Sequence, residues 1–160
     1  MGISYLTLDL PDDITFLPKF SYQHQFKQRI FGSADIGYLY YKGMDNTFQQ
    51  VPELRKRFTV DLAAKFSLFE MGGSHLRIAA GPSLWHVSDL VSKKINFNGN
   101  EVTDYERENR TYWDFGGNLG LELDINLSKR LSVMGNFQIV YLNKTELTPL
   151  LGLYAFYRIR

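Results

Sequence analysis

The chain lacks cysteine altogether, and none of its 160 residues lie in an apolar run long enough for a membrane-spanning helix. Without cysteine, neither a disulfide nor a thiolate metal site can form. A spanning helix needs about 20 consecutive apolar residues, so that class of membrane protein is excluded. The formal net charge is only +1, which provides no strong field toward nucleic acid. We therefore expect no nucleic-acid partner.

Motifs for metals and cofactors are missing as well. The three histidines, His24, His75 and His86, show no spacing typical of metal ligands. Gly72 and Gly73 form a glycine pair, but no helical pattern follows that could hold a phosphate at a helix N-terminus. We therefore expect neither a metal nor a cofactor.

The most informative pattern is the strict alternation of residues 113–127, which read WDFGGNLGLELDINL. Successive side chains of a strand point to opposite faces, so this segment predicts one strand with an apolar and a polar side. A strand in a soluble protein typically has about five or six residues, and this one is far longer. Aromatic residues make up 15% of the chain, which favours strands and interfaces. Together these features are typical of the wall of a membrane-spanning barrel.

The same alternation predicts eight strands, at residues 3–10, 15–27, 31–41, 57–69, 75–87, 113–127, 131–141 and 147–159. Short turns are expected at residues 28–30, 70–74 and 128–130, and long polar loops at residues 43–56 and 88–110. Short turns at one end and long loops at the other are typical of outer-membrane barrels. Pro82 interrupts one strand and predicts a bulge or a local loss of pairing. We expect one domain over residues 1–160: an all-β, eight-stranded, antiparallel, up-and-down transmembrane barrel.

Alternation alone does not say which face points outward. A soluble lipocalin-like carrier would enclose an apolar ligand with its apolar face, whereas a membrane barrel turns that face to lipid. Here the polar face is rich in glycine, serine, asparagine and aspartate and carries both signs of charge, which favours a crowded interior. Aromatic residues near the strand ends also suggest interfacial belts. We therefore predict a packed polar lumen with a charge network formed by Asp35, Asp61, Lys65, Arg77, Asp114, Glu122 and Asp124.

The segments RIAAGPSL at residues 77–84 and GGNLGL at residues 116–121 resemble strands of the small outer-membrane β-barrel proteins, typified by the OmpA transmembrane domain and OmpX. The resemblance covers nearly all of the chain. Gly152, Ala155 and Tyr157 partly match the final strand of that family, which closes on an aromatic residue. The resemblance implies the outer membrane of a Gram-negative bacterium. It also implies a role as a stabilising wall protein, adhesin, partner subunit or, rarely, enzyme.

A protein of the outer membrane is exported, so the first residues of the chain are compared with a secretory signal. A strand-like segment follows Met1 almost directly, with no secretory signal before it. An exported precursor needs such a signal. We expect that Met1 opens a mature form and that the native export signal is absent from this sequence.

An enzyme is the first alternative function. His86 and Ser88 form a His-x-Ser pattern at the loop end of a strand, where a histidine could activate a serine for cleavage of a lipid ester. The pattern resembles the lipid A deacylase barrels, although Asp89 stands where those proteins carry asparagine. Glu101 is the nearest acid at a comparable offset. The simpler interpretation places His86 at the level of the lipid headgroups, and three-residue patterns are common by chance.

A pore and a recognition surface are the other possibilities. Eight strands leave an interior only wide enough for side chains, so a satisfied charge network is favoured over conduction. The two long loops, residues 43–56 and 88–110, carry most of the remaining charge, and binding usually resides in loops on a rigid scaffold. Expected partners are outer-membrane lipids, lipopolysaccharide and a further protein. We predict a non-enzymatic barrel with a structural or surface-interaction role.

Overall fold

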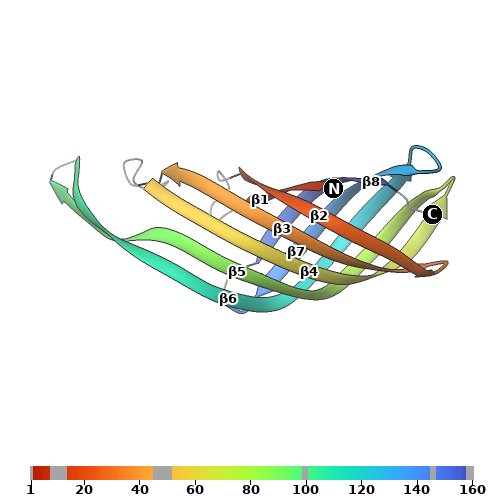
Figure 1. Cartoon of the computed structure of the whole chain (residues 1–160), viewed down its shortest axis with the longest axis horizontal. Coiled ribbons are helices and arrows are strands. Elements are labelled where there is room, and N and C mark those ends of the chain that lie inside the picture. Colours follow the sequence, from red (N-terminus) through yellow and green to blue (C-terminus); the bar gives the residue numbers. More distant parts are fainter. Residues whose placement is uncertain (1, 8–13, 45–51, 99–100, 145–146, 158–160) are drawn as a thin grey trace.

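The computed structural model describes residues 2–7, 14–44, 52–98, 101–144 and 147–157. These residues form a closed antiparallel barrel of eight strands, each hydrogen-bonded to its neighbours in chain order (Figure 1). The all-β, up-and-down barrel predicted from the sequence is therefore confirmed. The strands are β1 (Gly2–Thr7), β2 (Ile14–Lys27), β3 (Ile30–Met44), β4 (Pro52–Met71), β5 (Ser74–Asn98), β6 (Glu101–Asn126), β7 (Leu131–Leu142) and β8 (Thr148–Tyr157).

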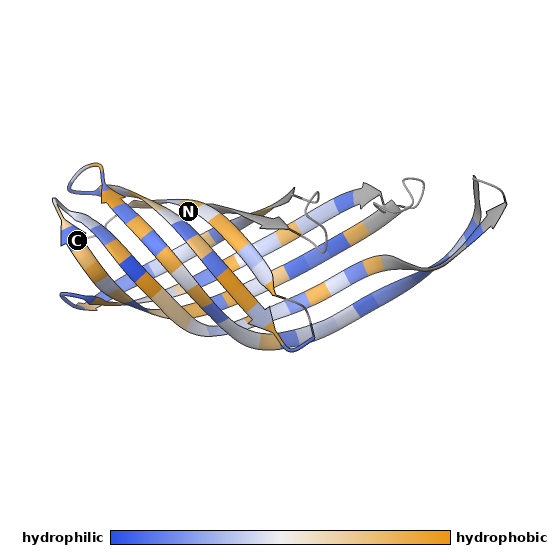
Figure 2. Ribbon diagram, turned by 180° about the vertical axis from the view of Figure 1, so that it is seen from behind, coloured by the Kyte–Doolittle hydropathy of each residue, from blue (hydrophilic) through white to orange (hydrophobic). Residues whose placement is uncertain are grey.

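The barrel carries its apolar side chains on the outside. Leu119, Leu121 and Leu123 of β6 are 62%, 47% and 48% exposed, while Asn118 and Glu122 on the opposite face of the strand are 6% and 5% exposed. Figure 2 shows the resulting alternation of apolar and polar residues along the strands of the wall. A soluble carrier would need the leucines around an enclosed cavity, so the lipocalin-like alternative is wrong. No helix in the described ranges is long and apolar enough to cross a membrane.

Short turns close three of the hairpins at one end of the barrel. Residues 28 and 29 join β2 to β3, residues 72 and 73 join β4 to β5, and residues 127–130 join β6 to β7. Gly72 and Gly73 have φ angles of 59° and 85°, the left-handed conformation that two-residue hairpin turns require. This end is called the turn end below, and the opposite end is called the loop end.

Strand pairing is interrupted at Pro82, as the sequence predicted. The β4–β5 register runs from Asp61–Ser83 to Ala64–Ala80 and skips the residues between them. Pro82 has no N–H to donate to the ladder, so the carbonyl of Leu62 loses that partner. The side-chain amide of Asn118 donates instead to Leu62 O at 3.2 Å and to Pro82 O at 3.1 Å. Asn118 therefore repairs the pairing defect from the neighbouring strand.

The two long loops predicted at residues 43–56 and 88–110 are largely strand, which corrects the prediction. β3 continues to Met44 and β4 already begins at Pro52; residues 45–51 lie outside the described residues. β5 and β6 extend the same hairpin far beyond the rest of the barrel (Figure 1). Beyond the apolar band both faces of a strand meet water, so the alternation that marks strands in the wall disappears there.

Candidate functional site

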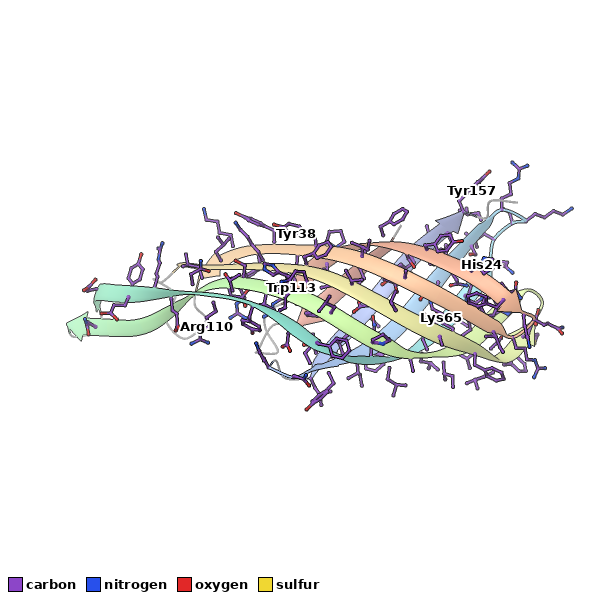
Figure 3. The ribbon with its side chains drawn as sticks, turned by 60° about the horizontal axis from the view of Figure 1, so that its bottom comes forward. His24, Tyr38, Lys65, Arg110, Trp113 and Tyr157 are labelled. Carbon is purple, nitrogen blue, oxygen red and sulfur yellow. The ribbon has the colours of Figure 1, made fainter. Side chains whose placement is uncertain are left out.

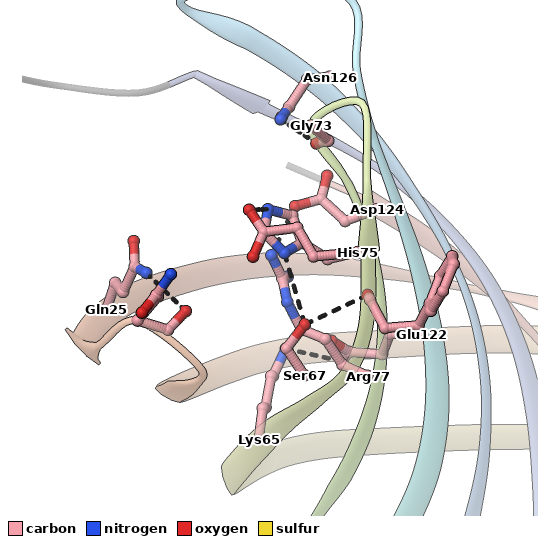
Figure 4. A network of polar contacts seen from close by, with 12 residues as sticks. Gln25, Lys65, Ser67, Gly73, His75, Arg77, Glu122, Asp124 and Asn126 are labelled. Atoms are coloured by element: carbon pink, nitrogen blue, oxygen red, sulfur yellow. Dashed lines mark hydrogen bonds and ion pairs between the residues drawn. The ribbon is translucent and has the colours of Figure 1, made fainter.

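In the described part of the chain, four ion pairs with largely buried side chains follow one another through the barrel interior. We call them the lumen ion pairs. The register of β4, β5 and β6 orders them from the turn end to the loop end. They are Arg77–Asp124 at 2.9 Å, Lys65–Glu122 at 2.6 Å, Lys19–Asp61 at 2.7 Å and Arg57–Asp89 at 3.3 Å. Figure 4 shows the two pairs nearest the turn end.

Asp61 links two other side chains of the interior. One carboxylate oxygen accepts a hydrogen bond from Lys19 at 2.7 Å, and the other accepts from the indole N–H of Trp85 at 3.2 Å. Lys19 also donates to the side-chain oxygen of Gln138 at 3.3 Å. Trp85 was absent from the predicted network. Its signal was its place on the strand, since Trp85 lies two residues from the buried Ser83 and therefore on the same, inward face of β5.

Two predicted network residues, Asp35 and Asp114, lie outside the lumen ion pairs. Asp114 is buried and accepts hydrogen bonds from the backbone N–H of Lys144, at 3.1 Å to each carboxylate oxygen. Asp35 is half-buried and lies directly opposite Asp61 in the β3–β4 register. Asp114 therefore binds the backbone of the segment that follows β7. Asp35 lines a small cavity.

The lumen also contains a cluster of apolar side chains on the loop-end side of the Lys19–Asp61 pair, which the polar-lumen prediction missed. This apolar plug consists of Leu17, Leu39, Trp85, Val140, Leu142 and Leu150, each no more than 1% exposed. Each of these residues lies an even number of positions from a polar inward residue of its own strand. Its side chain therefore points inward although it is apolar. Apolar packing at this level separates the lumen ion pairs near the turn end from the loop end.

The described part of the interior contains a small cavity that bears on conduction. The volume open to the centre of a water molecule is about 10 Å³, which is room for about one water. Its walls are Asp35, Ala63, Ala79, Asn118, Gly120, Glu122, Asn136 and Gln138. A space of this size beside an apolar plug offers no path for solutes through the described part of the barrel.

On the outside, an aromatic row crosses the loop-end half of the wall. Tyr38, Phe58, His86 and Trp113 are successive register partners across β3, β4, β5 and β6. The rings of His86 and Trp113 are 4.8 Å apart. Figure 3 shows Tyr38 and Trp113 on the exterior of the barrel. His86 therefore belongs to a belt of rings of the kind found at membrane–water interfaces.

The hydrolase alternative is not assembled in this structure. His86 and Ser88 share the outer face of β5, and the Ser88 hydroxyl contacts Thr111 Oγ1 at 3.4 Å. Glu101 pairs with Asn98, and Asn98 lies so far along β5 from Ser88 that the separation is about 33 Å at the rise of an extended strand. A carboxylate at that distance cannot orient His86. Within the described residues, no group of three or more histidine, cysteine, aspartate or glutamate side chains could hold a metal ion.

The charges expected in the first loop divide between the interior and the wall. Arg55 and Arg57 are buried at 9% and 4% exposure, and Arg57 belongs to the lumen ion pairs. Lys56 points outward and lies over the ring of Tyr40, 5.9 Å from its centroid. The side chain of Glu53 lies outside the described side chains. The arginines therefore close the mouth of the barrel and are not displayed to a partner.

The second predicted loop is largely a two-stranded extension of the wall, called the projecting hairpin here, made of residues 91–98 of β5 and residues 101–112 of β6. β6 pairs with β7 only from Gly116 onward, and β4 pairs with β5 only up to Leu90. No strand of the described part therefore covers the outer edges of the hairpin. Figures 1 and 2 show it extending past the barrel.

Side-chain contacts stiffen the described part of the projecting hairpin. Arg107 donates to the Tyr105 hydroxyl at 2.8 Å, and its guanidinium lies over the same ring. Arg110 forms an ion pair with Glu108 at 3.2 Å. These pairs are exposed, and each contributes little on its own. The side chains of Lys93, Lys94 and Glu101 lie outside the described side chains.

The fold is similar to that of solved bacterial proteins. No protein-family model matches the chain, and no curated protein matches it significantly in sequence. Neisserial surface protein A (NspA) has a TM-score of 0.68 at 10% identity, over 99% of this chain and 92% of that protein. Ail, the attachment invasion locus protein of Yersinia pestis, gives a TM-score of 0.61 at 12% identity in complex with the heparin analogue sucrose octasulfate. A second structure of Ail gives 0.59 at 13% identity, and both cover 99% of this chain and 93% of Ail. At these identities, the chain shares the fold of these proteins.

Proposed function

We propose that the chain is an integral outer-membrane protein of a Gram-negative bacterium whose role is surface interaction through the projecting hairpin. The observation that carries the proposal is the division of the molecule into an apolar-walled barrel and a polar arm that continues from it. An outward apolar face is stable against hydrocarbon, and a closed barrel leaves no unpaired backbone there. The described residues 104–110 of the hairpin are polar or charged apart from Tyr105, and such a segment belongs in water beyond the lipid.

The aromatic residues support this placement in a membrane. The row of Tyr38, Phe58, His86 and Trp113 would lie at one interface. Tyr157, next to the turn end, is 64% exposed and would lie at the other. Lys42 is exposed beyond Tyr40 at the loop end, where it could meet lipopolysaccharide phosphates together with Lys56.

The solved structures with a similar fold support a surface role. NspA is named a surface protein, and Ail is named for attachment and invasion and has been solved with a heparin analogue. Attachment of that general kind is the role proposed here. The apolar plug and the small size of the cavity favour it over transport, because the described part of the interior has no room for a passing solute.

The uncovered edge of β6 suggests how the hairpin would bind. A strand edge that pairs with nothing presents a row of N–H and C=O groups to an extended peptide. Asp104, Glu106 and Glu108 alternate along one face of that edge. A protein segment with lysine or arginine at every second position would complement both the backbone and these charges. The proposed partner is therefore an extended basic segment of another protein.

Two experiments test the proposal. The first uses the natural absence of cysteine: Arg107→Cys on the hairpin and Arg130→Cys at a turn are labelled in intact cells with a membrane-impermeant maleimide. We expect labelling of the first variant and none of the second. Equal labelling, or labelling at residue 130 alone, would contradict the placement of the hairpin outside the cell.

The second experiment tests strand addition with peptides. Extended peptides with alternating lysines are offered to the folded protein, together with the same peptides carrying N-methylated backbone positions. Binding should require free N–H groups, and it should be lost when residues 92–107 are replaced by an Asn-Gly turn. Equal binding of both peptides would show charge attraction alone and would remove the strand-pairing model.

A further inference from the structure

The cavity inside the barrel lies between five strands and is lined mainly by oxygen-bearing side chains. Asp35 comes from β3, Asn118 and Glu122 from β6, and Asn136 and Gln138 from β7. Ala63, Ala79 and Gly120 leave the space open because their side chains are small or absent. A single particle of about the size of water fits.

Two acceptor oxygens of the cavity have no partner. Glu122 is 5% exposed, and one of its carboxylate oxygens pairs with Lys65 at 2.6 Å. Its other oxygen, Oε2, is fully buried with no hydrogen-bond donor, and so is Oδ1 of Asn136. A buried acceptor without a donor costs about 1–3 kcal/mol. The cavity therefore concentrates negative potential that the surrounding side chains leave uncompensated.

The charge balance of the described interior is also negative. Five cationic side chains are buried: Lys19, Arg55, Arg57, Lys65 and Arg77. Five carboxylates are equally buried: Asp61, Asp89, Asp114, Glu122 and Asp124. The half-buried Asp35 is one carboxylate more. Lys19 forms its ion pair with Asp61 at 2.7 Å.

We propose that this cavity binds one monovalent cation of about the size of sodium, between Asp35, Glu122 Oε2 and Asn136 Oδ1. Hard oxygen donors such as carboxylates and amide oxygens suit alkali and alkaline-earth ions. One surplus negative charge, with Lys19 and Lys65 close by, favours a single positive charge over two. A bound cation would satisfy both orphaned oxygens and neutralise Asp35 in one step.

The test is the dependence of stability on the cation at constant ionic strength. The folded protein in detergent micelles is unfolded with urea and followed by tryptophan fluorescence, in sodium chloride or in choline chloride. An ion that binds only the folded state raises the unfolding midpoint with concentration until the site saturates. We expect this upward shift for the parent, its loss in Asp35→Asn, and its retention in the control Asp104→Asn on the projecting hairpin.

Two outcomes would overturn the proposal. Equal unfolding midpoints of the parent in sodium chloride and in choline chloride would show that the cavity binds no sodium ion and holds an ordered water. A sodium-dependent rise of the midpoint that persists in Asp35→Asn would show that the ion binds at another site. A second measurement on the parent alone applies if Asp35→Asn does not fold. Sodium should then raise the midpoint more than caesium, which is too large for the cavity; equal shifts would indicate screening and overturn the site.

Discussion

At the scale of single residues, the buried contacts of this barrel are dominated by polar groups. The apolar side chains of the wall face outward, so the interior between the turn end and the apolar plug is held by ion pairs and hydrogen bonds. Such contacts stabilise only when every member has a partner, because an orphaned buried charge is costly. Single substitutions of inward polar residues should therefore have larger effects than substitutions of outward leucines of similar size.

Asn118 is the clearest case, because it supplies the donors that Pro82 cannot. Its amide also donates to the Ser83 hydroxyl at 2.9 Å. We expect Asn118→Ala to lower the free energy of unfolding by about 1–3 kcal/mol, since buried carbonyls lose their donor. The measurement is urea unfolding in micelles. Asn109→Ala on the projecting hairpin is the control, and an equal effect of both substitutions would contradict the role assigned to Asn118.

We expect the effects of substituting Lys65 and Glu122 on the free energy of unfolding to be strongly non-additive. Lys65→Met leaves Glu122 as an uncompensated buried charge, and we expect a loss of about 3–5 kcal/mol. Glu122→Gln on the same background removes that charge, so the double variant should recover much of the loss. A double-mutant cycle measures the coupling. Additive effects of the two substitutions would show that the pair contributes nothing as a pair.

At the scale of elements, the strands of the barrel wall could be predicted from the sequence, whereas the strands of the projecting hairpin could not. Residues 113–126 alternate because one face meets an apolar environment and the other fills the lumen. Residues 104–110 belong to the same strand, but their described side chains are mostly exposed on both faces, so no alternation marks them. Strand pairing with β5, a tertiary property, extends β6 to Glu101. The start of this strand predicted from the sequence therefore marks the start of its apolar face and not the start of the strand itself.

The odd or even position of a residue along its strand predicted whether its side chain points into the barrel better than its polarity did. Leu17, Leu39 and Val140 look like wall residues by type, yet each lies in phase with polar inward positions of its strand and joins the apolar plug. The same rule also identifies Lys19 and Trp85 as inward. Which inward residues meet one another could not be read from sequence, because pairs such as Lys19–Asp61 cross an intervening strand and depend on the register.

The projecting hairpin should be less stable locally than the barrel wall. Its outer edges carry backbone groups that no described strand covers, and its side-chain pairs are exposed. Local opening costs little in such a segment. We expect amide hydrogens of residues 104–112 to exchange faster with deuterium than those of residues 117–124, as measured by mass spectrometry in micelles. Equal protection of both segments would indicate a second packing surface for the hairpin.

At the scale of the whole molecule, the barrel is a rigid support with a filled centre. Its closure leaves no strand edge within the wall, the lumen ion pairs and the apolar plug fill the interior, and the one long hairpin extends beyond it. Each part follows from one physical assignment, in which apolar side chains face hydrocarbon and polar side chains face inward. The proposed surface role depends on that assignment, because the membrane orients the hairpin.

The two tryptophans of the chain test this assignment directly. Trp113 is 55% exposed on the outer wall, and Trp85 is fully buried in the lumen. Trp85→Phe and Trp113→Phe each leave one tryptophan, which is excited selectively at the red edge of its absorption. Both variants are folded into vesicles with and without brominated lipids, which quench by contact. We expect strong quenching of Trp113 and almost none of Trp85. Quenching of Trp85 that equals or exceeds that of Trp113 would contradict the account.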